Sequence, residues 1–271
     1  MLLLVWLALV GLGMVCVLPA LAEPPVKLAT TTSTQNSGLL DVLLPLYQKA
    51  VQAAPGAVQV IAVGTGKALK LGESGDVDLV MVHAPEVEKE HLARGVFVDR
   101  RPVMRNYFVL LGPPGDPAQV RGLPTVISQL QKIRSADARF VSRGDQSGTH
   151  VKELNLWRQA GGRPSGSTLL EVGQGMGQTL VIANEKRAYT LSDEGTFLAF
   201  KQKLALEVLS TPEEALANYY AVMAVNPQRH PTINHQGALR LMDWLTSVEA
   251  ARAIAGYTKH GRQLFVPERT P

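Results

Sequence analysis

The sequence has a single cysteine in 271 residues, and this scarcity restricts the chemistry open to the protein. Cys16 lies inside an apolar N-terminal run, residues 1–22, that contains no charged side chain. The run ends with Ala20-Leu21-Ala22, which is typical of a cleavage site, so we predict that residues 1–22 are a signal peptide. A chain cleaved there has no cysteine, which excludes thiol catalysis, disulfides and cysteine–metal sites. The alternative is an uncleaved membrane anchor, because about 20 apolar residues can span a bilayer.

Basic clusters are also missing. The formal net charge is only +4, and Arg100-Arg101 is the longest basic run. Nucleic-acid binding usually requires a basic stripe, so we expect no nucleic-acid partner. The sequence contains no Walker motif, no GxGxxG and no G-x-S-x-G nucleophile elbow. It therefore does not indicate nucleotide binding or α/β-hydrolase chemistry.

Short runs of β-forming residues alternate with stretches of helical spacing along the rest of the chain. Strands alternating with helices indicate βαβ units, an α/β fold and mainly parallel sheets. The predicted strands cover residues 27–30, 58–63, 78–82, 107–111, 140–141, 169–172, 188–191 and 219–225. The predicted helices cover residues 39–53, 86–94, 178–185 and 234–255, with others from 67 and from about 150 to 160.

This order of elements predicts two lobes with a cleft between them. Lobe I would comprise residues 26–108 and 221–271, and lobe II residues 109–220. The runs at 107–111 and 219–225 would then cross between the lobes. Ligands of open α/β sheets bind beyond the carboxyl ends of the strands, so we expect a ligand in the cleft.

Four polar loops share one design, in which a strand is followed by glycines or hydroxyl residues and then by a helix. Glycine lets backbone N–H groups approach a ligand, hydroxyls add donors, and a helix N-terminus favours negative charge. Arg143 adds a cation, and we expect Asp145 to hold its guanidinium. The loops therefore predict an anion site, although N-caps and turns use the same residue types. The loops are Thr30–Ser33, Gly64–Gly66, Ser142–Thr149 and Gly173–Gly177.

Two other readings of the same residues are weaker. The run GDQSGT resembles the GDSG of serine proteases, which would make Ser147 the nucleophile of a secreted hydrolase, but Gln146 interrupts it and no histidine has a triad spacing. His83 with Glu86, and His150 with Glu153, have spacings compatible with metal ligands. Such pairs are common by chance, so we expect no metal, no cofactor and no catalysis.

Several of these motifs, in this order, resemble the periplasmic tungstate-binding proteins of ABC transporters. They include LATTTSTQNSG, VQVIAVGTGKAL, FVSRGDQSGTH, GQGMGQTL and YAVMAVNP, and the likeness covers nearly the whole mature chain. The resemblance implies a two-lobe periplasmic-binding-protein fold of type II that captures a tetrahedral oxyanion, most readily tungstate. It also implies a periplasmic monomer that serves an ABC permease and its ATPase and meets the membrane only through the permease. Binding of molybdate, sulfate or phosphate, and a sensor of the same fold, remain alternatives.

The resemblance also implies a set of ligand contacts, made through hydrogen bonds and not through a metal centre. Hydroxyls, one guanidinium and the backbone N–H groups of glycine-rich turns would surround the anion. The residues are Thr31, Thr32, Ser33, Gly64, Thr65, Arg143, Ser147, Gly148, Thr149, Gly175 and Met176. Three places depart from the family pattern. Ala84 replaces the acid of a VHD motif, Arg105 stands in MRNYFVLLGP, and the stretch TPEEALANYYAV lacks the usual LFNPY. Loss of the acid at Ala84 disfavours phosphate, which carries a proton that such a carboxylate can accept.

Overall fold

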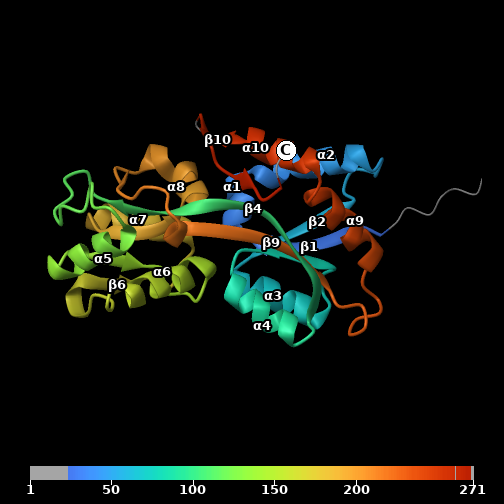
Figure 1. The fold of residues 1–271 in the computed structure, drawn as a ribbon, viewed down its shortest axis with the longest axis horizontal. Coiled ribbons are helices and arrows are strands. Elements are labelled where there is room, and N and C mark those ends of the chain that lie inside the picture. The colour runs from blue at the N-terminus through green and yellow to red at the C-terminus, as the bar shows by residue number, and fades with distance from the viewer. Residues whose placement is uncertain (1–23, 260, 270–271) are drawn as a thin grey trace, which may run out of the picture.

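The structure, a computed structural model, describes residues 24–259 and 261–269, so the predicted signal peptide lies outside the described residues. Two lobes lie side by side and are joined by two long strands, β4 and β9 (Figure 1). No helix within the described residues is long and apolar enough to cross a membrane. The strands are β1 Val26–Thr31, β2 Val58–Val63, β3 Leu79–Val82, β4 Phe97–Gly112, β5 Phe140–Ser142, β6 Leu169–Glu171, β7 Tyr189–Asp193, β8 Glu207–Val208, β9 Ala217–Val225, β10 Thr258–Lys259, β11 Arg262–Gln263 and β12 Val266–Pro267.

The helices follow the strands in the alternation that the sequence predicts. Three short 3-10 turns, at Gly166–Thr168, Lys201–Lys203 and Glu214–Leu216, complete the elements of the described residues. The α-helices are α1 Thr32–Ser37, α2 Leu39–Ala50, α3 Thr65–Ser74, α4 Pro85–Ala93, α5 Val126–Ser135, α6 Gly148–Gln159, α7 Met176–Lys186, α8 Glu194–Phe200, α9 His235–Leu245 and α10 Val248–Gly256.

One mixed sheet runs through both lobes, in the order β2-β1-β3-β9-β4-β7-β5-β6. Lobe I contributes the parallel pairs β1–β2 and β1–β3, and lobe II the parallel pairs β5–β6 and β5–β7. The crossing strands β4 and β9 are antiparallel to their neighbours. The predicted α/β two-lobe fold is therefore confirmed, with antiparallel crossing strands at its centre. The proposed lobe boundaries, at 108/109 and 220/221, fall inside these two strands.

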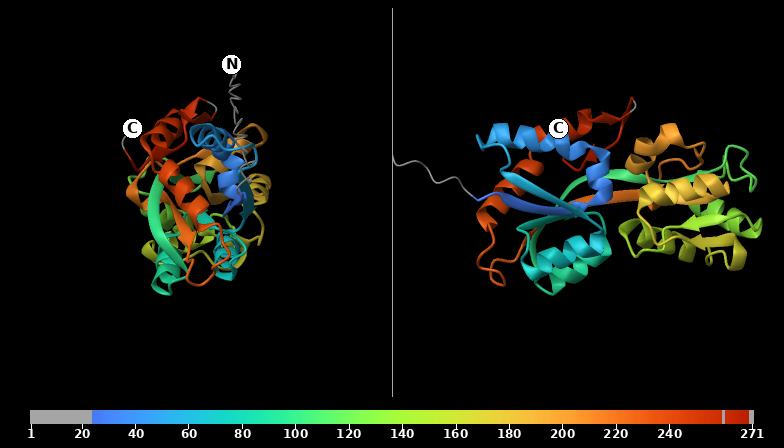
Figure 2. Two further views of the ribbon diagram at one scale, coloured as in Figure 1. Left: turned by 90° about the vertical axis from the view of Figure 1, so that its right-hand side faces the viewer. Right: turned by 180° about the vertical axis from the view of Figure 1, so that it is seen from behind.

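Helices cover both faces of this sheet, and its side chains alternate between two sides. Leu79 and Met81 pack with α2, α9 and α10, whereas Val80 and Val82 pack with α3 on the opposite face. This alternation is the period of two expected of a strand buried on both sides. Figures 1 and 2 show the same division, with α2 and α10 on one side of the sheet and α3 and α4 on the other. In lobe II, α5 and α6 pack on a second core around Phe140 and Trp157.

The structure contains α5, α8 and the short strands β8, β10, β11 and β12, which were not predicted, and three predicted segments differ from what it shows. The crossing strand β4 begins at Phe97, ten residues before the predicted start at 107. The sequence pattern missed this start because bulges between Val98 and Arg101 and between Pro102 and Met104 interrupt the apolar alternation. The predicted polar loop after β1 contains α1, which Gly38 ends in a left-handed conformation at φ 81. The predicted helix 234–255 is two helices, because Ser247 caps α10 by accepting a hydrogen bond from the N–H of Ala250.

Gly72 of α3 offers a test of how tightly this helix packs on the crossing strand. A Cβ atom at position 72 would overlap the ring of Phe97, whereas a Cβ at Gly66 in the same helix would meet open space. We expect Gly72→Ala to lower the free energy of unfolding by about 1–3 kcal/mol, the usual cost of overpacking a core. The matched variant Gly66→Ala should raise it by up to about 1 kcal/mol, because alanine favours the helix. Urea unfolding of both variants measures the difference, and equal effects would contradict the packing described.

Candidate functional site

The four predicted loops lie at the carboxyl ends of parallel strands. In lobe I, Thr31 ends β1 and pairs in register with Val63 of β2, so the Thr31 loop and the Gly64–Thr65 loop are neighbours. In lobe II, Ser142 of β5 pairs with Glu171 of β6, which places Arg143 beside the glycine-rich loop before α7. Each lobe therefore brings two of the loops together at one edge of its sheet.

A cluster of hydroxyls forms around a histidine in lobe I. Thr31 Oγ1 lies 3.0 Å from Ser33 Oγ and 3.2 Å from Nε2 of His83, and Ser33 Oγ lies 3.4 Å from the same nitrogen. Thr31 also caps α1, where its Oγ1 accepts a hydrogen bond from the N–H of Thr34. The side chains of Thr31, Ser33 and His83 are all buried. His83 follows β3 directly, at the same edge of the sheet as Thr31.

The other ring nitrogen of His83 faces the crossing strands. Its Nδ1 lies 2.9 Å from Oδ1 of Asn218 on β9. The amide nitrogen of Asn218 donates hydrogen bonds to Asn106 Oδ1 at 2.8 Å and to the hydroxyl of Tyr220 at 3.1 Å. Because Oδ1 of Asn218 is an acceptor, Nδ1 of His83 carries the hydrogen. Burial, followed by the positive charge of Arg143, lowers the pKa of His83, so the ring is neutral near pH 7 with its lone pair on Nε2.

Arg143 is the cation of the lobe II half of the site, and it is held from two sides. Its Nε forms an ion pair with Oδ2 of Asp145 at 2.8 Å and donates to the carbonyl oxygen of Gln174 at 3.3 Å. The other carboxylate oxygen of Asp145 accepts a hydrogen bond from the N–H of Ser147. The expectation that Asp145 holds the guanidinium is confirmed. Neither terminal nitrogen of Arg143 bonds to another described residue, so both remain as donors for an anion.

Three helices present their N-terminal N–H groups at these loops. Gly64 caps α3 and Gly175 caps α7, and neither cap supplies a side-chain acceptor. A Cβ at either glycine would meet nothing within 4 Å, so open space adjoins both caps. Ser147 caps α6 and accepts a hydrogen bond from the N–H of His150. The first-turn N–H groups of α3 and α7 therefore lack side-chain partners, which suits an anion.

The two lobes meet at Gly148. A Cβ at this position would lie 3.3 Å from Cε1 of His83 and 3.4 Å from Oγ1 of Thr65, so the first residue of α6 touches the Thr65 loop directly and reaches the Thr31 loop through His83, whose Nε2 contacts Thr31. With the bond from Arg143 to Gln174, this contact connects all four loops in one chain of neighbours. Thr65, Arg143, Ser147 and Gly148 are all buried, which describes a closed arrangement of the lobes.

Several buried polar atoms beneath the Arg143 loop have no partner among the described residues. Oγ1 of Thr149 and Nε2 of His150 make no hydrogen bond, and neither does Oε1 of Glu153, one turn further along α6. An orphaned buried hydroxyl is rare in a folded protein and usually has a ligand or a water molecule as its partner. The Thr149 hydroxyl, which is 1% exposed, therefore agrees with a ligand position in this part of the cleft.

The structure brings most of the predicted site residues together and also places two residues there that the sequence analysis did not assign to an anion site. Of the predicted set, Thr32 has an exposed side chain, and Gly64 and Gly175 are exposed at the rim. The remaining predicted residues are buried. His83 and Asn218 were not predicted. The position of His83 at the end of a parallel strand is a signal that could have found it, whereas the contact of Asn218 depends on the order of strands in the sheet.

The alternative readings find little support in the geometry. Within the described residues, no group of three or more His, Cys, Asp or Glu side chains could hold a metal ion. Ser147 Oγ bonds to the backbone N–H of His150, and Nδ1 of that ring accepts from the N–H of Gln146. A serine nucleophile needs a base at its hydroxyl, and no described imidazole occupies that position.

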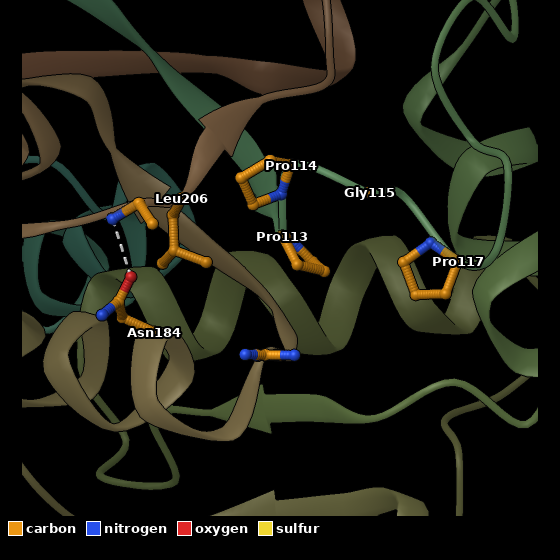
Figure 3. Close-up of a pocket in the computed structure, with 8 residues that line it drawn as sticks. Pro113, Pro114, Gly115, Pro117, Asn184 and Leu206 are labelled. Carbon is orange, nitrogen blue, oxygen red and sulfur yellow. Dashed lines mark hydrogen bonds between the residues drawn. The ribbon is translucent and has the colours of Figure 1, made fainter.

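One cavity adjoins these loops, and another lies apart from them. A cavity of about 240 Å³ opens beside His83 and Gly148 at the lobe boundary, with Lys152 of α6 in its wall. A cavity of about 650 Å³ lies elsewhere in lobe II, where Pro113, Pro114, Pro117 and Leu206 form an apolar wall (Figure 3). The second cavity contains none of the hydroxyl loops, so the anion site is not there.

Comparison with known proteins places this geometry in a family. A family model described as the PBP superfamily domain matches residues 19–249. The chain belongs to the PBP superfamily. Tungstate-binding protein TupA from Peptoclostridium acidaminophilum is 42% identical over 252 residues, which cover 91% of this chain and 86% of that protein. The chain therefore also belongs to the family of these TupA proteins.

Two solved structures of this family have the same fold. The tungstate ABC transporter structure from Geobacter sulfurreducens is 48% identical, with a TM-score of 0.80, and the match covers 87% of this chain and 100% of that chain. The tungstate-binding protein TupA from Desulfovibrio alaskensis G20 is 39% identical, with a TM-score of 0.81, and covers 91% of this chain and 100% of that chain. The two-lobe fold is thus shared with experimentally determined members of the family.

The buried carboxyl of Glu153 predicts a pH dependence of stability. Burial raises its pKa to about 7, above the ordinary value of about 4.3. Between about pH 4.3 and about pH 7 the folded protein keeps this proton while the unfolded chain loses it. The free energy of unfolding of the wild type therefore falls as the pH rises through this range. We therefore expect Glu153→Gln to gain about 2–4 kcal/mol relative to the wild type between about pH 4 and about pH 8. Urea unfolding across this range measures the gain.

The exposed variant Glu185→Gln on α7 is the control for this titration. Its stability should follow the wild type at every pH. A constant difference between Glu153→Gln and the wild type across the range would show that Glu153 does not titrate in the folded protein.

Proposed function

We propose that this protein captures tungstate, a tetrahedral dianion, between its two lobes and delivers it to an ABC importer. The observation that carries the proposal is the meeting of the Thr31, Thr65, Arg143 and Gly175 loops at one closed position between the lobes. The names of the TupA relatives support tungstate as the ligand.

The geometry suits a dianion because it offers many donors and little competing negative charge. Each hydrogen bond to a charged group contributes about 1.5–3 kcal/mol, so several together can offset the loss of the hydration shell. Asp145 forms an ion pair with Arg143 through Oδ2, and its Oδ1 accepts a hydrogen bond from the N–H of Ser147. The anion would then be held by the free nitrogens of Arg143, by hydroxyls such as Thr65, and by first-turn N–H groups.

The rest of the proposal concerns where and with what the protein acts. It works in the periplasm as a monomer, and the permease of the importer receives the closed, loaded form while an ATPase drives transport. It catalyses no reaction, which agrees with the engagement of Ser147 Oγ as a helix cap. A ligand-dependent closure of this kind gives the permease a state to recognise.

Calorimetric titration with tungstate, molybdate, sulfate and phosphate tests the function. We expect tungstate to bind and phosphate to bind weakly or not at all. If molybdate or sulfate bound more tightly than tungstate, that anion would replace it as the ligand. The function would be wrong if none of the four bound.

Arg143→Ala should remove the strongest single contact of the site. Loss of two charge-assisted hydrogen bonds, each about 1.5–3 kcal/mol, predicts an affinity for tungstate at least about 100-fold weaker. Arg143→Lys should lose less, because the charge remains while the planar fork is lost. Arg158→Ala, which changes an exposed arginine of α6, should bind as the wild type does. Equal affinities of Arg143→Ala and Arg158→Ala would exclude Arg143 from the site.

Gly148→Ala should oppose closure of the lobes without removing a ligand contact. The added methyl group would lie 3.3 Å from His83 and 3.4 Å from Thr65 Oγ1, so one lobe must move. Overpacking of this kind costs about 1–3 kcal/mol, which corresponds to an affinity about 5- to 150-fold weaker. Calorimetry measures the affinity, and small-angle scattering with saturating tungstate measures closure. The control is Gly256→Ala, whose Cβ meets open space; a loss of affinity as large as this in the control would refute the explanation.

A further inference from the structure

His83 touches three parts of the molecule at once. Its Nε2 meets the hydroxyls of Thr31 and Ser33, its Nδ1 meets Asn218 on the crossing strand β9, and its Cε1 edge faces Gly148 of lobe II. The ring is 5% exposed and stacks on Tyr220 at 4.7 Å between ring centroids. A titratable side chain at this junction is in a position to respond to a ligand that both lobes enclose.

The hydrogen count at this junction is unfavourable for an anion. Neutral His83 has its lone pair on Nε2, so a hydroxyl of Thr31 or Ser33 must donate its only proton to the ring. That proton is then unavailable to the ligand. Thr31 Oγ1 also lies 3.0 Å from Ser33 Oγ and 2.7 Å from Thr34 Oγ1, and one hydroxyl of each pair must act as acceptor. With a neutral ring, the cluster therefore presents fewer donors to the cleft than it has hydroxyl groups.

Protonation at Nε2 reverses this count. The imidazolium donates from Nε2 to Thr31 Oγ1 or Ser33 Oγ, and the hydroxyl that was bound to the ring becomes free to donate to the anion. The positive charge also moves close to the site. Both changes favour a dianion, so the bound dianion and the ring proton stabilise each other.

The charges that face His83 make this balance sensitive to the ligand. Arg143, from the loop after β5, disfavours the imidazolium, whereas the carboxylate of Asp193, at the start of α8, favours it. The Tyr220 hydroxyl from β9 stays neutral, because burial raises its pKa. Binding of a dianion next to Arg143 would offset the positive charge that opposes protonation.

We propose that His83 takes up one proton from solvent at Nε2 when the dianion binds, and thereby turns a hydroxyl of Thr31 or Ser33 towards the ligand. His83 acts through these hydroxyls, so it is a positioning residue. The inference rests on the proposed function, because it requires an anion between the lobes. It assigns to the site a dependence on pH, with affinity that rises as the pH falls through the neutral range.

Titration calorimetry with tungstate in Tris and in PIPES tests this inference. The two buffers release protons with different enthalpies, so the difference in measured heat gives the number of protons taken up. At about pH 7.5, about one unit above the ordinary imidazole pKa, we expect an uptake of up to one proton per tungstate. The affinity should rise by up to about tenfold for each unit of decreasing pH, and the rise should continue below about pH 6.5, because burial lowers the pKa of the unliganded ring.

Variants assign the proton to His83. His83→Gln should bind tungstate with no uptake, since its amide does not titrate. His91→Gln, on α4 and bonded to the carbonyl oxygen of Val87, should keep the uptake of the wild type. His150→Gln is the rival test, because that ring lies beside the Arg143 loop. If His83→Gln does not fold, the ¹⁵N shifts of the imidazole in the wild-type protein, with and without tungstate, give the same answer.

The outcomes separate this inference from the function on which it rests. Tungstate binding without proton uptake would overturn the role of His83 and leave the function in place. Uptake that persists in His83→Gln, or that disappears in His150→Gln alone, would assign the proton elsewhere and also overturn it. Failure of all four oxyanions to bind would remove both the function and the inference.

Discussion

The central constraint on the proposed function is that a doubly charged anion must lose its water where little positive charge is free to replace it. Arg143 is buried, but Asp145 already neutralises part of its charge at 2.8 Å. Most of the compensation must therefore come from dipoles, namely hydroxyls and helix N-termini held in fixed positions. Parallel strands supply this arrangement directly, because every strand of a parallel set ends at the same edge and each is followed by a helix. Two such sets facing each other give a cage.

The crossing strands connect this cage to the relative position of the lobes. Asn106 on β4 accepts a hydrogen bond from Asn218 on β9, and Asn218 in turn contacts Nδ1 of His83, so the hydroxyl cluster is built onto the strands that join the lobes. Arg105, on the same stretch of β4, is bound at 2.8 Å to Glu268, which follows β12. Bending at these strands would move the ligand loops and the C-terminal segment together. A change in the angle between the lobes would therefore also change the positions of the residues that surround the ligand.

The separation of two residues along the chain decides whether their contact could be predicted from the sequence. The four loops could be predicted because their glycines and hydroxyls are contiguous and stand between a strand and a helix. The two halves of the sheet could be predicted from the same alternation. The contact between His83 and Asn218 could not, because it joins residues 135 positions apart through the antiparallel placement of β9 against β3. The early start of β4 was also hidden, since its bulges place charged residues and Pro102 inside a strand.

The proposed preference for an anion without a proton agrees with the bonds that the carboxylates already make. An anion such as hydrogen phosphate needs an acceptor for its proton, and the sequence has Ala84 where the family pattern has an acid. The N–H of Ala84 is bonded to Glu88, which faces away towards Arg100. Asp193 uses its two oxygens on the N–H and hydroxyl of Thr196. With Asp145 also occupied, the described site residues offer donors almost alone, and such a lining favours an anion that has no proton of its own.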